Sequence, residues 1–90
     1  MTEDEILVKE VQLGNSAANA KELFVSAYIE TRRIQLLQEF ISIDVKKSAR
    51  IFEIKYSLDA LLDLERNINY LISSGNAAKI QLTENEQLTQ

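Results

Sequence analysis

The sequence predicts an all-α fold: a helical hairpin of two long antiparallel helices, preceded by a short N-terminal helix and paired with a second copy in a dimeric bundle. Two long segments repeat apolar residues at alternating steps of three and four, which is typical of helix packing. Ala, Leu, Glu, Gln and Arg dominate from Ala17 onward, and these residues favour helices. Apolar residues outside the two repeats predict that a further surface is covered by another chain.

The short N-terminal helix is predicted from its two ends. Thr2 and Glu5 have the Thr-x-x-Glu spacing of a capping box, and apolar residues follow at Ile6, Leu7 and Val11. Leu13-Gly14-Asn15 predicts its end, with Gly14 in the left-handed position after the last turn. Asn15 or Ser16 then caps the next helix.

Each long helix has one predicted seam, by which we mean the line of residues that faces the other helix. The first seam comprises Ala20, Leu23, Ala27, Glu30, Ile34, Leu37 and Ile41. The second comprises Ile51, Ile54, Leu58, Leu61, Glu65, Ile68 and Ile72. Glutamate is the one charged residue of each seam. Folding the chain near Lys46 places apolar residues opposite one another, with Ile34 facing Leu58.

The connection between the helices is predicted at residues 42–48, with Asp44 or Ser48 capping the second helix. An alternative remains open here. Residues 40–58 alternate apolar and polar side chains twice, which also suits a central β-hairpin in an α+β fold. Burial of the two helical seams favours the helical corner, because burying one large apolar side chain contributes about 1.5–3 kcal/mol.

Ser73-Ser74-Gly75-Asn76 predicts the end of the second helix. Residues 1–75 are therefore expected to form a single helical domain. Residues 76–90 are expected to form a polar, flexible C-terminal tail, in which Leu82 and Leu88 can dock locally.

The composition argues against an enzyme. The 90-residue chain has no cysteine and no histidine, so thiolate chemistry, the usual zinc sites and Ser-His nucleophile pairs are excluded. No Gly-rich phosphate loop or EF-hand loop is present. We therefore expect no catalytic residues, no metal site and no cofactor. The acidic N-terminal segment lacks the pattern of a signal peptide, and no apolar run is long enough to span a membrane. A small acidic protein of the cytoplasm is expected.

Apolar residues that belong to neither seam give the strongest functional prediction. They are Phe24, Tyr28, Ile29, Leu36 and Phe40 in the first helix, and Phe52, Tyr56, Leu62, Leu64 and Leu71 in the second. A lone hairpin cannot bury a second apolar side. The sequence therefore predicts a protein–protein interaction module, such as an adaptor, an assembly factor or a chaperone-like protein. Phe24, Tyr28, Phe52 and Tyr56 are predicted to contact the partner, which is a second copy or another protein.

A basic cluster at the predicted corner supplies a rival function. Lys46, Lys47 and Arg50 lie within residues 32–58, which carry six basic and three acidic residues. The remaining segments, 1–31 and 59–90, are both acidic. This basic tip can contact an acidic partner surface, so its three cations are also candidate partner-binding residues. It can equally serve a nucleic-acid-associated regulator, although the net charge of −4 argues against general nucleic-acid binding.

The segment IFEIKYSLDALLDLERNINYL resembles the opening strand and first helix of ParE/RelE-type toxins. The similarity rests on an apolar strand followed by Ser57, Ala60, Asp63, Leu64, Glu65, Tyr70 and Leu71. It implies a degenerate toxin-like module with a central β-ribbon. The family continues into a sheet that carries its basic functional residues, whereas AAKIQLTENEQLTQ follows here, which has no such pattern. No functional residue is therefore assigned from the resemblance.

Overall fold

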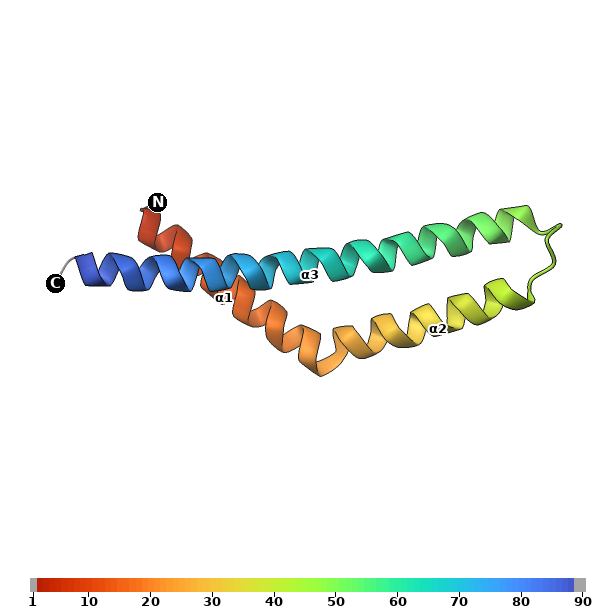
Figure 1. Ribbon diagram of the computed structural model, residues 1–90, viewed down its shortest axis with the longest axis horizontal. Helices are drawn as coiled ribbons and strands as arrows, with labels where there is room; N and C mark the ends of the chain where they lie inside the picture. Colours follow the sequence, from red (N-terminus) through yellow and green to blue (C-terminus); the bar gives the residue numbers. More distant parts are fainter. Residues whose placement is uncertain (1, 89–90) are drawn as a thin grey trace.

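The computed structural model describes residues 2–88, and within this range the chain is helical except for Thr2 and the connection at residues 43–47. The first arm of the hairpin comprises α1 (Glu3–Ala20), the π-helical turn η1 (Lys21–Val25) and α2 (Ser26–Ser42). The second arm is the single helix α3 (Ser48–Leu88). The two arms run antiparallel, with the connection at one end and both termini at the other (Figure 1). The predicted all-α helical hairpin is therefore confirmed.

Helix α1 begins where the capping pattern predicts. The Thr2 hydroxyl accepts a hydrogen bond from the backbone N–H of Glu5 at 3.2 Å, which satisfies one of the free donors of the first turn. Glu3, Asp4 and Glu5 also place negative charge at the positive end of the helix dipole.

The predicted end of α1 at Leu13-Gly14-Asn15 is wrong, because the helix continues through Gly14 to Ala20. Gly14 has a negative φ and is buried, so it is not a left-handed cap. It lies where α1 crosses α3, against Gly75 (Figure 1). A Cβ on Gly14 would lie 2.8 Å from Gly75 Cα and 2.9 Å from the Leu71 carbonyl oxygen. Glycine is required here because two helix backbones touch.

Helix α3 likewise continues through the predicted end at Ser73–Asn76, and Ala78 beyond it is buried. Gly75 is the partner of Gly14 in the crossing rather than a helix stop. Residues 76–88 are therefore described as helix, whereas the division of the chain into a domain at 1–75 and a flexible tail at 76–90 stays a prediction. Thr89 and Gln90 of that tail lie outside the described residues.

The turn η1 joins α1 to α2 without ending the helix. The backbone N–H of Ser26 donates to the carbonyl oxygen of Lys21, five residues back, which is the π-helical hydrogen bond. This wider turn accommodates one extra residue. Ala17 and Val25 consequently both face α3, although a regular helix would separate residues eight apart by about 80°. The first arm bends at this position (Figure 1).

Large apolar side chains form the core between α2 and α3. Leu36 and Ile54 are completely buried, and Val25, Ile29 and Leu61 join them. Ala20, Ile43, Leu58 and Ile68 pack against this cluster. The predicted second seam agrees with the structure, since its residues are buried or half-buried from Ile51 to Ile72.

The predicted first seam is wrong for η1 and α2. Leu23 is 77% exposed and Ile41 82% exposed, whereas Val25, Ile29 and Leu36 face the core. The helix is apolar on two sides. The residues that face α3 each come two positions after a predicted seam residue, so they lie on roughly the opposite side of the helix. The register also differs: Glu39 lies opposite Arg50 in the structure, whereas the predicted pairing placed it opposite Glu53.

The connection at residues 43–47 matches the predicted corner closely. The Asp44 carboxylate accepts from the backbone N–H of Lys46 at 2.9 Å, so it closes a turn just before α3 rather than capping the helix itself. Residues 2–88 contain no strand. The alternative α+β fold with a β-hairpin at 40–58 is therefore wrong, and the β-ribbon implied by the toxin resemblance is helix instead.

The molecule is long and thin. Its Cα radius of gyration is 19.2 Å, compared with about 12 Å for a compact domain of this length. Its extents of 68 × 23 × 16 Å correspond to a layer of two helices. None of the helices described is both long enough and apolar enough to cross a membrane.

Candidate protein-interaction surface

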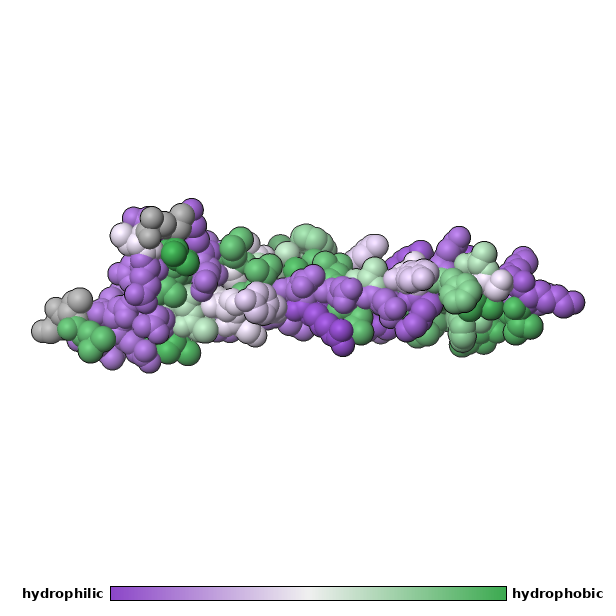
Figure 2. Space-filling model, turned by 90° about the horizontal axis from the view of Figure 1, so that it is seen from above, coloured by the Kyte–Doolittle hydropathy of each residue, from purple (hydrophilic) through white to green (hydrophobic). Residues whose placement is uncertain are grey.

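An apolar groove lies between α2 and α3 near the connection. Its volume is about 310 Å³. The groove is lined by Leu37, Phe40, Ile51, Phe52, Ile54, Lys55 and Leu58. Lys55 contributes its aliphatic stem, because its Nζ lies 3.1 Å from the Asp59 carboxylate one turn further along. The exposed lining is therefore apolar, and in Figure 2 hydrophobic side chains gather at this end of the molecule beside a hydrophilic band.

The groove exists because α2 is apolar on two sides. Leu36 and Leu37 are adjacent in sequence and therefore lie about 100° apart around the helix. Leu36 is completely buried against α3, whereas Leu37 is 43% exposed. Phe40 on α2 and Phe52 on α3 are also exposed, so two aromatic rings project at the groove. Such a surface can bind apolar side chains of another helix.

A second depression lies on the opposite side of the hairpin. It is lined by Tyr28, Arg32, Ser57, Ala60, Leu61 and Leu64. Ser57 and Lys55 are two residues apart on α3, so they point to opposite sides of the helix. This second depression is more polar than the groove, and it lies further from the connection. The two openings therefore cannot bind one continuous partner surface.

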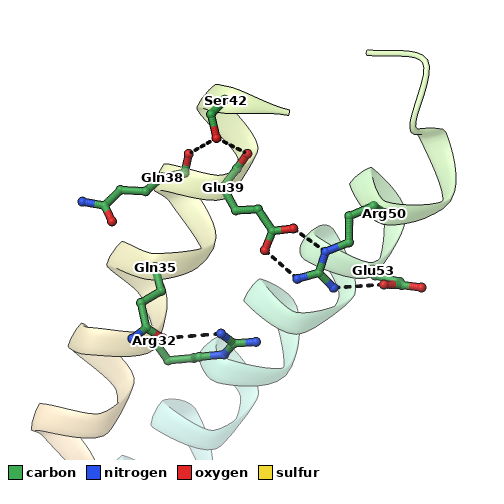
Figure 3. A network of polar contacts seen from close by, with 7 residues as sticks. All are labelled: Arg32, Gln35, Gln38, Glu39, Ser42, Arg50 and Glu53. Atoms are coloured by element: carbon green, nitrogen blue, oxygen red, sulfur yellow. Dashed lines mark hydrogen bonds and ion pairs between the residues drawn. The ribbon is translucent and has the colours of Figure 1, made fainter. Parts of the chain in front are cut away.

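Ion pairs neutralise part of the predicted basic tip. Arg50 donates two hydrogen bonds to the Glu39 carboxylate across the hairpin and a third to Glu53 at 2.9 Å (Figure 3). The hydrogen bonds from Arg50 lower the pKa of Glu39 and raise the pKa of Arg50 itself. Arg50 thus joins the two arms and is not an unpaired cation at the surface.

Lys46 and Lys47 differ from Arg50. Both are exposed in the connection, and among the described residues neither side chain has an ion-pair partner. Asp44 offsets one of the two charges locally. The basic tip is therefore smaller than the sequence suggested, with two available cations.

The structure does not gather the four predicted aromatic contact residues into one surface. Phe52 lines the groove, whereas Tyr28 lines the opposite depression. Phe24 and Tyr56 are exposed but line neither opening. Their predicted partner contacts are untested, and the binding surface proposed below includes neither residue.

Sequence reasoning missed several residues of the groove. Leu37 and Ile51 were assigned to the seams between the helices, although both line the groove in the structure. Phe40 was recognised as an extra apolar residue but not as part of a binding site. The signal that could have found them is their spacing: Leu37, Phe40 and Ile41 share one side of α2, next to the stripe formed by Ile29 and Leu36.

The site contains no arrangement of side chains typical of a metal centre. Within residues 2–88, no group of three or more His, Cys, Asp or Glu residues is placed to hold a metal ion. The groove offers apolar contact area and flanking charges.

Comparison with known proteins gives no relative. No family model matches the chain, and neither the curated proteins nor the solved structures contain a significant match.

Proposed function

We propose that this protein is a non-enzymatic protein–protein interaction module that binds its partner through the apolar groove between α2 and α3. An adaptor, an assembly factor and a chaperone-like protein all fit this description. The absence of a catalytic role and a location in the cytoplasm belong to the same proposal. Nucleic-acid binding is not favoured, because Arg50 is engaged by two glutamates and two lysines remain.

The observation that carries the proposal is the amount of exposed surface. The chain exposes 6812 Å², whereas a compact monomer of its mass of 10.3 kDa exposes about 5400 Å². The excess of about 1400 Å² on one chain is more than the roughly 800 Å² that each partner buries in a specific interface. Large apolar side chains contribute to the exposed surface, since Phe40, Phe52 and Ile41 are more than half exposed.

The experiment recovers partners from the native host with a tagged chain. Phe52→Asp places a charge in the groove, and Phe24→Asp is its matched control, because both phenylalanines are 61% exposed but Phe24 lies outside the groove. Circular dichroism first establishes that both variants remain helical. We expect the wild-type chain and Phe24→Asp to recover the same partner, a second copy included, and Phe52→Asp to lose it.

Equal recovery by all three chains would show that the groove is not the binding site. Specific binding of a small-molecule substrate in the groove would contradict the interaction module as the function.

A further inference from the structure

The groove has an occupant that the chain itself can supply. We propose that the groove binds the groove of a second copy, in a two-fold antiparallel arrangement that brings the loop lysines of each chain to Glu30 and Asp59 of the other. This inference rests on the proposed function and names the partner.

Self-pairing fits the shape of the site. The groove provides a hollow lined by Leu37, Ile51 and Leu58, and it also provides exposed rings at Phe40 and Phe52. A two-fold interface uses the same surface on both partners, so each ring of one chain meets the hollow of the other. The two hairpins then form two stacked layers of two helices each, and the residues of both grooves are buried between the layers.

The charges around the groove are arranged for the same pairing. Glu39 of α2 lies opposite Arg50 of α3. Because the helices are antiparallel, Glu30, nine residues before Glu39, lies level with Asp59, nine residues after Arg50. Glu30 lies two turns before Leu37, and Asp59 lies one turn after Lys55, so both acids are on the groove side. Each acid already forms an ion pair within its own chain, Glu30 with Arg33 at 3.4 Å and Asp59 with Lys55 at 3.1 Å. Exposed pairs of this kind are weak, so a lysine of the second chain can join each of them. Lys46 and Lys47 lie beyond the other end of the groove.

The positions match along the helix axis. Residue 53 lies midway between Lys47 and Asp59, and it falls within the α3 stretch that lines the groove, from Ile51 to Leu58. A two-fold axis at this level therefore places Lys47 of one chain level with Asp59 of the other. The overlapping stretch is about 18 Å long, from twelve residues at 1.5 Å each.

Charge also selects the direction. If two copies stacked in parallel, Lys46 and Lys47 of both chains would lie side by side, and these unpaired cations would repel. The antiparallel arrangement separates the lysines and places them beside Glu30 and Asp59, whose negative charges are only partly offset by Arg33 and Lys55. Because the overlap covers only the loop half, the interface is small and the dimer is expected to be weak.

The experiment is a charge swap followed by sedimentation equilibrium over a range of about 1 µM to 1 mM, which brackets a weak dimer. One variant carries Lys46→Glu and Lys47→Glu, and the other carries Glu30→Lys and Asp59→Lys. The second variant also removes the ion pairs with Arg33 and Lys55, so circular dichroism first establishes that both variants remain as helical as the wild type. We expect the wild type to dimerise and each variant alone to dimerise about tenfold more weakly or worse, because like charges then meet at both ends. An equimolar mixture of the two variants is expected to recover the wild-type affinity as a heterodimer.

Two further variants keep the test independent of folding. Combining all four substitutions in one chain should restore the homodimer, and Phe52→Asp should abolish it while Phe24→Asp does not. A wild-type chain that is monomeric throughout would overturn the self-pairing, although partner recovery would still test the interaction module. A dimer whose mixture of variants fails to recover, or that Phe24→Asp breaks, would overturn the proposed arrangement.

Discussion

The two halves of the hairpin are packed by different means. At the crossing of α1 and α3, small residues let the helix backbones touch: Gly14, Ala17, Gly75 and Ala78 are buried there. In the loop half, large side chains such as Leu36 and Ile54 keep α2 and α3 apart, and apolar rings remain exposed beside them. α1 accordingly lies closer to α3 than α2 does.

The two kinds of packing leave different amounts of room beside the helices. Because the backbones of α1 and α3 touch at the two glycines, no side chain of a partner can enter between these helices. The loop half has a wider spacing, and side chains fill the centre but leave a groove at the edge. The half with the larger core residues is therefore also the half with the apolar groove.

The greatest loss of stability is expected when a buried leucine of the loop half is replaced, and a much smaller loss when an exposed one is. Leu36→Ala removes a completely buried side chain and should lower the free energy of unfolding by about 2–5 kcal/mol. Leu37→Ala, at the adjacent but 43% exposed position, should cost less than half as much in dilute solution. Urea denaturation at low protein concentration measures both. Equal losses would show that α2 faces α3 with a different side.

The next effect tests the crossing. Gly14→Ala places a Cβ within 3.0 Å of two backbone atoms of α3, so the helices must separate, at a cost of roughly 1–3 kcal/mol. The higher helix propensity of alanine offsets up to about 1 kcal/mol of this. Gly75→Ala should behave alike, because its Cβ meets Gly14 Cα at 2.8 Å. Chemical denaturation of the two single variants and the double variant provides the measurement.

The double variant Gly14→Ala with Gly75→Ala tests whether the two glycines share one contact. Once one Cβ has separated the helices, the second has space, so the combined loss should be smaller than the sum of the two single losses. Additive losses would argue against a shared contact. Asn76→Ala is the control, since Asn76 adjoins Gly75 but is exposed, and it should change stability little.

The smallest effect concerns the ion pair at the loop end. The pKa of Glu39 is lowered in the folded chain by its hydrogen bonds from Arg50, so protonation of Glu39 favours unfolding. The ion pair between Glu39 and Arg50 stabilises the fold fully above the ordinary carboxyl pKa. This stabilisation is lost as the pH falls through the lowered pKa of Glu39. The stability difference between wild type and Glu39→Gln should therefore be positive at pH 7 and shrink in acid. Urea midpoints at several pH values measure it, and a difference that stays constant with pH would contradict the pairing.

Much of the fold could be predicted from the sequence. The seam of α3 repeats strictly from Ile51 to Ile72, and the connection stands out because helix-forming residues give way to Asp44 and Ser48. The first arm could not be predicted as well, because α2 has two apolar sides and periodicity alone does not choose between them. The choice depends on the backbone contact at Gly14 and on the extra residue held in η1.

The glycines show the same limit. Gly14 and Gly75 both carry the local pattern of a helix end, because each is followed by asparagine and has a serine within two positions. Their role depends on a residue some sixty positions away, which no local pattern reports. An excess of exposed apolar side chains was predicted and is present, but which of them line the groove follows from the side of α2 that faces the core.

The short connection at residues 43–47 also bears on the order in which the molecule folds. Arg50 and Glu39 are 11 residues apart, whereas Asn85 and Asp4, which meet near the termini, are 81 apart. Closing the longer loop from an open chain costs roughly 2 kcal/mol more in chain entropy. Contacts between the two arms are therefore expected to form first near the connection and then progressively toward the glycine crossing. The groove then takes shape before the ends have met, so a folding chain forms this apolar surface early.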